Sequence, residues 1–497
     1  MDNQKKLHNN FISEHENLFI IILIIFGSIR VLVFSAAFPL FNDVDEQAHF
    51  DTIVKYSEGY LPRQGNDFFC RESVEIILLF NTPEYLHSGR AHRPPGTIPW
   101  IYASKDFAQE INSWTMQKNP EAFSFPVYYA IGGDWYAIGK KLGLYGGQLV
   151  YWIRFLNGGI FALLIGITYL FCKKFYRDNP AIRFGVPLLL SFFPQNIFYA
   201  INSDVISPLL FLISLYLLLK IASEKISLPL SLLTGAAIAA TFLIKISNIP
   251  ILVVFIGFIL LYALKPLNIK GAGKKSHFIL TMVATAIIPI MLWLWWNKYA
   301  LGDFSGSAAK VQYLGWNIKP FMEMWKHPLF SIHGLYLFCS EIIKTFWRGE
   351  FLWKSKTLCS NNMDFFFVIS SVAFPLASII STLNDEYGAS HRRLVYLNAS
   401  ILIIYLLYLA ALSVIYDFGN CYYPSRAFPY FASGRLMLGS LIPFLVLYIQ
   451  GLVFILSRIN KSINPLIVIF LICIIMMYAE IYTILPVFSS QYNWFHL

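Results

Sequence analysis

The chain has 497 residues, of which 57% are hydrophobic and only 13% are charged. This composition excludes an ordinary soluble domain and predicts an all-α protein whose helices cross a membrane several times. The formal net charge of +10 comes from short basic segments between apolar runs. Aromatic residues do not interleave with these segments, so we expect no nucleic-acid partner. The six cysteines form no C-x-x-C pair, which excludes the usual zinc signature.

The first apolar run covers residues 18–38 and is long enough to cross a bilayer of about 30 Å. It is longer than the core of a signal peptide, and no small-residue cleavage site follows it, so we expect a retained anchor. Further runs of the same kind bring the prediction to roughly eleven spans. The others lie near 150–172, 184–201, 205–222, 227–244, 248–264, 277–297, 362–382, 394–415, 436–457 and 463–485.

Basic residues gather in every other connection between the predicted spans. They are Lys5 and Lys6, residues 173–183, Lys220 and Lys225, residues 265–275, residues 391–393, Arg458 and Lys461. The positive-inside rule makes this side cytoplasmic. We therefore expect a multi-pass protein of the cell inner (plasma) membrane with a cytoplasmic N-terminus.

The whole chain, residues 1–497, is predicted to form one transmembrane domain with two long extracytoplasmic segments. These segments are residues 39–149 and 298–361. Within the first, residues 125–143 have the aromatic and glycine content of a helix lying in the membrane interface. The same side also carries cysteines for which a disulfide is permitted but no pairing can be deduced. They are Cys70, Cys339, Cys359 and Cys421.

A group of ionisable residues follows the first span directly, in the stretch "NDVDEQAHF" (42–50). Asp45 and His49 stand four residues apart and would share one face of a helix. Asp43 and Glu46 have the spacing of a capping box, which would explain these two residues without any function. Asp43 and Asp45 also form a D-x-D pair, a weak motif for a divalent metal such as Mg²⁺ or Mn²⁺.

Further polar residues are expected at the same depth, where other spans reach the extracytoplasmic side. Asp204 ends "FYAINSD", Lys245 interrupts "FLIKISNIP", and Arg435 opens "RLMLGSLIP". Arg426 lies in the third extracytoplasmic loop, residues 416–435. Each cation alone would be explained by snorkelling to the interface. Taken together, these four residues are predicted to bind an anionic substrate group.

This combination suits glycosyl transfer from a polyprenyl-phosphate sugar donor to a glycan or lipid acceptor. A carboxylate takes the proton of the acceptor hydroxyl, and nearby cations hold the phosphate that leaves with negative charge. The lipid tail of the donor would lie among the spans, in contact with membrane lipids. No nucleotide sugar is available outside the cell, which favours a lipid-linked donor.

The stretch "DEQAHF" (45–50) resembles the D-E-x-x-H-F signature of predicted bacterial membrane proteins of unknown function that look like GT-C glycosyltransferases. The similarity continues in the same order through residues 125–143, 150–166, 192–207 and 432–444. The resemblance implies a GT-C-like fold, inverting transfer, and a catalytic group in which Asp45 is the base. Glu46 and His49 would shape or orient that site. Phe125 and Leu436 depart from the proline and tyrosine usual in the family's motifs.

Two other functions remain open at this point. A transporter or flippase of lipid-linked saccharides would also need cations, but it is expected to carry ionisable residues or broken helices near the bilayer midplane. Few such features lie within the predicted spans. A non-enzymatic assembly subunit would leave the carboxylates after the first span without a role. The enzyme is therefore the favoured interpretation.

Overall fold

The structure is a computed structural model, and it describes residues 15–43, 45–80, 107–224, 226–263, 272–353, 356–383, 388–419 and 429–493. The predicted all-α class is confirmed. The strands in the described part are two residues long: β1 (Asn317–Ile318), β2 (Leu352–Trp353), β3 (Lys356–Thr357) and β4 (Tyr416–Asp417).

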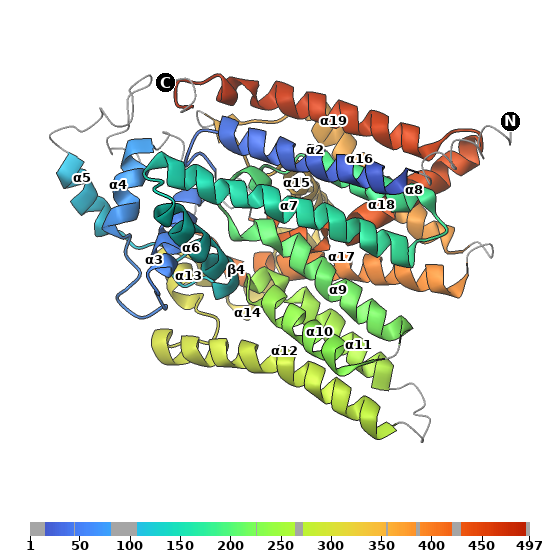
Figure 1. Ribbon diagram of the computed structural model, residues 1–497, viewed down its shortest axis with the longest axis horizontal. Coiled ribbons are helices and arrows are strands. Elements are labelled where there is room, and N and C mark those ends of the chain that lie inside the picture. The colour runs from blue at the N-terminus through green and yellow to red at the C-terminus, as the bar shows by residue number, and fades with distance from the viewer. Residues whose placement is uncertain are drawn as a thin grey trace.

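The described chain contains eight helical segments that are long and apolar enough to cross a membrane. Most of them run along the longest axis of the molecule (Figure 1). They are α2 (Glu16–Ala37), α7 (Gly147–Phe175), η4 (Ser203–Ile206) with α9 (Ser207–Ser223), α12 (Ala272–Leu301), α16 (Asn361–Ser381), α17 (Ala389–Ile415), η8 (Gly434–Ser440) with α18 (Leu441–Ile459), and α19 (Pro465–Phe488).

The expected count of eleven spans is therefore wrong. The runs predicted at 184–201, 227–244 and 248–264 form only the short helices α8 (Pro180–Ser191), α10 (Leu228–Phe242) and α11 (Pro250–Ala263). Helices of 12, 15 and 14 residues, at about 1.5 Å per residue, fall short of a bilayer. Polar residues and prolines break these runs, because the chain leaves the helix before Pro194 and forms η3 (Asn196–Tyr199). It does so again at Lys245, before η5 (Ile246–Asn248).

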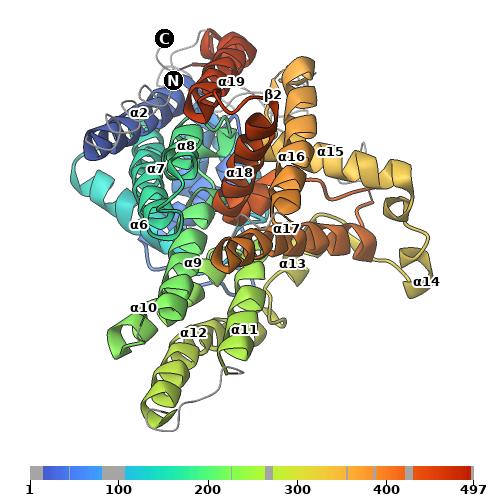
Figure 2. The ribbon, with the colours of Figure 1, turned by 90° about the vertical axis from the view of Figure 1, so that its right-hand side faces the viewer.

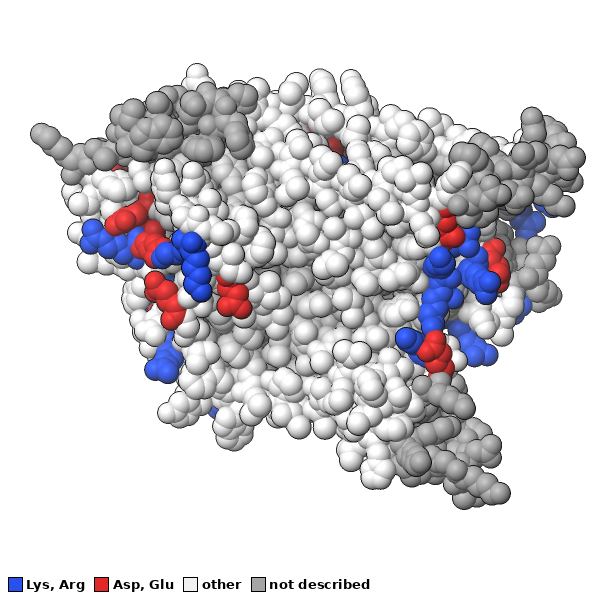
Figure 3. Space-filling view, in the orientation of Figure 1, with Lys and Arg blue, Asp and Glu red and all other residues white. Residues whose placement is uncertain are grey.

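Charged side chains gather at the two ends of the molecule and leave a broad, nearly uncharged band between them (Figure 3). We call the end that carries α3 to α6 and α13 the loop end, and the opposite end, near the N-terminus, the basic end (Figure 1). Exposed Lys173 and Arg177, at the end of α7, belong to the basic end. This distribution suits a protein whose middle is surrounded by lipid.

The first long segment forms α3 (Glu46–Ser57), α4 (Arg71–Phe80), α5 (Phe107–Thr115) and α6 (Pro126–Lys141). The helix predicted across residues 125–143 is thus present as α6. Its backbone lies close to α3, because a Cβ atom on Gly133 would stand 2.9 Å from the backbone nitrogen of Ser57. Glycine at this position lets α6 hold α3 against the bundle.

The second long segment forms α13 (Ala308–Tyr313), β1, α14 (Phe321–Met324), η7 (Pro328–Phe330) and α15 (Ile332–Arg348). Strand β1 pairs antiparallel with β4, which joins this segment to the end of α17. Helices α14 and α15 extend sideways from the bundle (Figure 2). The five cysteines within the described residues are free thiols, and Cys421 lies outside the described residues.

Candidate functional site

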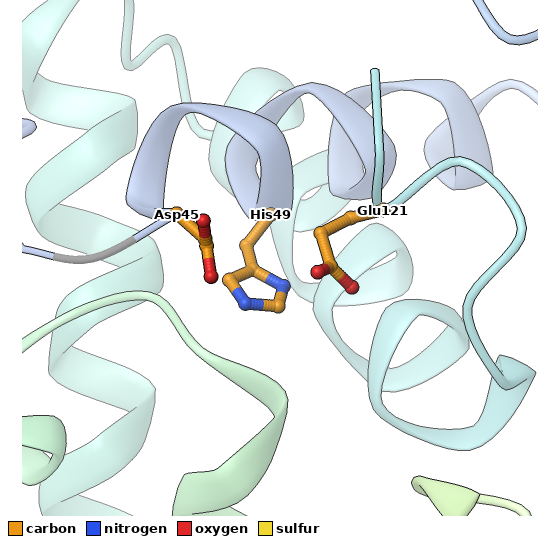
Figure 4. A group of neighbouring side chains, drawn as sticks. All are labelled: Asp45, His49 and Glu121. Atoms are coloured by element: carbon orange, nitrogen blue, oxygen red, sulfur yellow. The ribbon is translucent and has the colours of Figure 1, made fainter. Parts of the chain in front are cut away.

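Asp45, His49 and Glu121 come together at the loop end and point toward a common space (Figure 4). One ligand-type atom of each lies within 4.8 Å of the others. Asp45 and His49 share a face of the first turn of α3, as predicted, and the His49 N–H donates to the Asp45 carbonyl at 3.0 Å. Glu121 comes from the segment between α5 and α6. We call these three residues the acidic cluster.

Asp45 occupies an unusual backbone position. It precedes the first residue of α3 with φ of 61°, in the left-handed region, and its side chain makes no capping hydrogen bond. The carboxylate is 39% exposed and accepts a hydrogen bond from Arg435 Nη2 at 3.1 Å. A side chain that faces outward instead of capping its own helix is available to a substrate.

The capping-box interpretation is wrong. Helix α3 begins at Glu46 and its N-cap position is Asp45, so Asp43 lies two residues too early on the chain to act as the N-terminal cap. The buried Asp43 carboxylate instead accepts a hydrogen bond from Asn196 Nδ2 at 3.1 Å. Asp43 therefore ties the end of the first span to η3.

The predicted substrate-binding residues Asp204, Lys245 and Arg435 meet beside the acidic cluster. Lys245 Nζ lies 2.8 Å from Asp204 Oδ2, and Arg435 Nε lies 3.8 Å from the same oxygen. The expected approach of the two cations is thus confirmed. Arg435 Nε also lies 3.7 Å from Glu350 Oε2. Arg426 lies outside the described residues.

A third cation, Lys310 of α13, closes the other side of the cluster. Its ammonium donates to Glu121 Oε1, and it remains one-third exposed. Tyr129 of α6 lies between Glu121 and His49. Its hydroxyl is 3.3 Å from Glu121 Oε2 and 2.7 Å from His49 Nδ1. Carboxylates and cations from distant parts of the chain therefore surround one space.

These contacts fix the charge of the cluster. Burial alone would raise the pKa of Asp45, but Arg435 and Lys310 outweigh it and hold this pKa below its usual value. Burial also acts to raise the pKa of Glu121, and Lys310 reverses that effect. Burial lowers the pKa of His49 to about 4. At neutral pH both carboxylates are ionised and the imidazole is neutral.

Glu46 lies behind the cluster and outside it. Its buried carboxylate receives two hydrogen bonds of 2.7 Å from Arg154 of α7, and the N–H of Ile201 donates to it at 3.1 Å. Arg154 also donates to the carbonyls of Ser35, Phe38 and Pro39 at the end of the first span. Glu46 thus fastens the start of α3 to the bundle, which is a positioning role.

A divalent metal fits this site poorly. Asp43 and Asp45, the predicted pair of metal ligands, do not face one common site, because the Asp43 carboxylate turns toward Asn196. Asp45, His49 and Glu121 offer two carboxylates and one imidazole, but Arg435 and Lys310 already neutralise the carboxylates. Mg²⁺ or Mn²⁺ would have to displace both cations.

Three residues of the site escaped the sequence analysis: Glu121, Lys310 and Glu350. None stands in a recognisable motif, and the partners Glu121 and Lys310 are 189 residues apart. The available signal was weak: all three lie in or beside the two long segments, which were already expected to share a side of the membrane.

The chain was also compared with known proteins. The sequence profile of the family described as "Predicted membrane protein (DUF2142)" matches residues 29–417. The chain belongs to this family. Its description states no activity, and no curated protein and no solved structure gives a significant match. The matched range includes the whole acidic cluster with Lys245 and Lys310, whereas Arg435 lies beyond it.

Proposed function

We propose that the protein is a GT-C-type membrane glycosyltransferase that moves a sugar from a polyprenyl-phosphate-linked donor to a cell-surface glycan or lipid acceptor. One observation carries the proposal. A partly exposed, ionised carboxylate, Asp45, stands among cations suited to a phosphate, at one end of a bundle of apolar helices. Base and phosphate-binding groups are the two requirements of this reaction.

In the proposed reaction, Asp45 takes the proton of an acceptor hydroxyl while the hydroxyl oxygen forms a bond to the anomeric carbon of the donor sugar. The bond from that carbon to the phosphate oxygen breaks, and the polyprenyl phosphate leaves with the electron pair. Arg435 and Lys245 hold the departing phosphate. Because the attack is a single displacement, the anomeric configuration inverts.

The pairing of Asp45 with Arg435 supports a link between donor binding and base activation. Without donor, Arg435 neutralises the carboxylate across 3.1 Å. A donor phosphate competes for the guanidinium and frees the carboxylate to accept a proton. His49 and Glu121 lie beside Asp45 and act as positioning residues in this scheme.

The same proposal places the loop end on the extracytoplasmic side of the plasma membrane. Basic residues at the opposite end support this orientation through the positive-inside rule. The donor's tail then lies in the bilayer while its phosphate reaches the cations. The acceptor approaches from outside the cell.

The decisive experiment is transfer by purified Asp45→Asn protein in lipid nanodiscs, with a polyprenyl-phosphate sugar as donor. Asparagine keeps the size of the side chain and tolerates the left-handed backbone, but it is not a base. We expect transfer to fall by about 10² to 10⁴-fold, with donor binding largely kept. Full activity in this variant would end the assignment of the base.

Two further variants sharpen this test. Asp134→Asn changes an exposed aspartate on α6 and is the matched control, for which we expect normal transfer. Asp43→Asn alters the contact with Asn196 and is expected to keep most of the activity while lowering the free energy of unfolding by about 1 kcal/mol. A larger loss of transfer in Asp43→Asn than in Asp45→Asn would move the catalytic role to Asp43, or to a metal bound by the pair.

A flippase of lipid-linked saccharides is the second candidate, and one feature favours it. Arg30 of α2 and Glu480 of α19 form a buried ion pair of 2.7 Å within the spans. The Arg30 guanidinium also donates to the Tyr199 hydroxyl and to the carbonyls of Ser191 and Phe193. Both of its terminal nitrogens are thus engaged within the protein and are not free to bind a transported substrate. Liposomes with a fluorescent polyprenyl-phosphate sugar on one leaflet separate the candidates, because translocation without transfer would identify a flippase.

A further inference from the structure

A hollow of about 470 Å³ opens beside α13, between this helix and the strand pair β1 and β4. It lies outside the acidic cluster and shares no residue with it. Its polar lining consists of Asp303, Ser305, Ser307, Gln312 and Asn317. Trp316 and Tyr416 line it as well. The hollow is thus a mixed polar and aromatic surface in the size range of small-molecule sites.

The chemistry of this lining suits a neutral compound with many hydroxyl groups. Amide, hydroxyl and carboxylate groups exchange hydrogen bonds with sugar hydroxyls, and aromatic rings pack against the C–H faces of a sugar ring. Asp303 is the one carboxylate that the described part of the chain supplies to the lining, and it accepts from the Ser305 hydroxyl at 2.7 Å and the Ala308 N–H at 3.2 Å. Among the described residues that line the hollow there is no lysine or arginine. An anion such as a phosphate is therefore a poor fit.

The aromatic wall of the hollow is held in place before any ligand arrives. Strands β1 and β4 pair Ile318 with Tyr416, and the Lys319 N–H donates to the Ile415 carbonyl at 2.9 Å. The Trp316 ring packs edge-on against Phe418, with centroids 4.8 Å apart. A preformed wall lowers the ordering cost of binding.

The hollow and the acidic cluster lie on two sides of the same short helix. Gln312 of α13 faces the hollow, whereas Lys310, two residues earlier, reaches Glu121. The hollow and the acidic cluster therefore both adjoin α13.

We propose that this hollow binds a saccharide unit of the acceptor. The inference rests on the proposed function, since it assigns the acceptor side of the same site. Donor and acceptor are then recognised by different chemistry: cations for the phosphate of the donor, and amides with aromatic rings for the neutral sugars of the acceptor.

Saturation-transfer difference NMR tests this directly. The probe is a mixture of the methyl glycosides of glucose, galactose, mannose and N-acetylglucosamine, added to the full-length protein in nanodiscs without donor. We expect at least one glycoside to give signals with the wild type. In the double variant Gln312→Ala with Asn317→Ala, two exposed hydrogen-bonding groups are removed, and we expect affinity to fall by about tenfold.

The matched control is Asn112→Ala with Gln117→Ala, which removes the same two residue types from α5 and the turn after it, away from the hollow. Its signals should equal those of the wild type. Absence of any signal from the wild type would overturn the inference. Signals that persist unchanged in the Gln312 and Asn317 variant would also overturn it, because the sugar would then be bound elsewhere.

Failure of the saccharide site can be distinguished from failure of the proposed glycosyltransferase activity, because the NMR measurement needs no donor and no turnover. If glycoside binding depends on Gln312 and Asn317 but no transfer occurs with any lipid-linked donor, the saccharide site stands and the glycosyltransferase proposal fails. If transfer occurs but the double variant binds glycosides normally, the enzyme stands and the site is wrong.

Discussion

Asp45 combines a left-handed backbone, a partly exposed carboxylate and a single cationic hydrogen-bond partner. A residue kept only for helix capping would turn its side chain toward the free N–H groups of the first turn. Asp45 turns away from them, toward Arg435. The backbone strain thus places the carboxylate where a substrate can reach it, which is how strained residues at functional sites are commonly used.

His49 predicts a specific dependence of stability on pH. Its folded pKa of about 4 lies below the unfolded value near 6.5, so between these values the unfolded chain binds more protons. Stability is fully present above about pH 6.5 and declines as the pH falls toward 4. At pH 5 we expect the free energy of unfolding to be lower by about 2 kcal/mol than at neutral pH, because of the protonation of His49 in the unfolded chain.

Thermal unfolding in detergent at pH 7.5 and pH 5 measures this decline. The His49→Gln variant removes the titrating group but keeps a polar side chain for Tyr129, so its stability should fall less over the same range. An equal decline in both proteins would contradict the neutral, buried histidine.

At the residue scale, the sequence predicted the Asp45 and His49 pair because their spacing matches one helical turn. It also placed Asp204, Lys245 and Arg435 at a common depth. It could not find Glu121 with Lys310, since an ion pair between segments 189 residues apart depends on tertiary packing alone. The resemblance implied that Glu46 would shape or orient the site, and its buried ion pair with Arg154 is compatible with such a positioning role.

The anchoring of α3 to α7 depends on one buried ion pair. Arg154 and Glu46 are 1% and 0% exposed, so removing one partner leaves an uncompensated buried charge. We expect Arg154→Met to lower the free energy of unfolding by about 3 to 5 kcal/mol. Chemical or thermal unfolding of the purified protein measures the loss.

An exposed pair is the matched control for this prediction. Arg71 and Glu75 form an ion pair on α4 with side chains 72% and 44% exposed. Arg71→Met should change stability by less than about 1 kcal/mol, because exposed pairs contribute little. Equal effects of the two substitutions would show that Glu46 and Arg154 do not carry the anchoring of α3.

Gly349 tests the close contact between the end of α15 and η3. It has φ of 79°, and a Cβ atom there would lie 1.5 Å from Asn196 Oδ1. Gly349→Ala should therefore displace Asn196, which binds Asp43, and destabilise the protein by about 1 to 3 kcal/mol. Gly257→Ala on α11 has open space around it and should be neutral in the same unfolding assay. A neutral Gly349→Ala would show that α15 and η3 are not in close contact.

Element boundaries were less predictable than element type. Apolar composition identified helices throughout the bundle, but it did not show where α8, α10 and α11 end. Hydropathy averaged over a window hides single breaks such as Pro194 and Lys245, where the chain changes direction. The ends of these short helices bring Asn196, Asp204 and Lys245 to the candidate site.

For the whole molecule, the proposed orientation makes a labelling prediction. Cysteines replacing Met116 and Met322, which are 76% and 70% exposed, should react with a membrane-impermeant maleimide in intact cells. A cysteine replacing Ile459, 71% exposed at the end of α18, should react only after the cells are opened. The exposed Cys359 is first replaced by serine. The reverse pattern would place the loop end in the cytoplasm.

The ion pair between Arg30 and Glu480 has a consequence for biosynthesis. The partners are 450 residues apart, and ribosomes add about 5 to 20 residues per second, so roughly 20 to 90 s separate their appearance. During that interval the guanidinium in α2 lacks its carboxylate, and a charge without a partner in hydrocarbon is unfavourable. An unfinished chain therefore differs from a finished one by a charge that lacks its ion-pair partner. Formation of the pair, once α19 has been made, removes this difference.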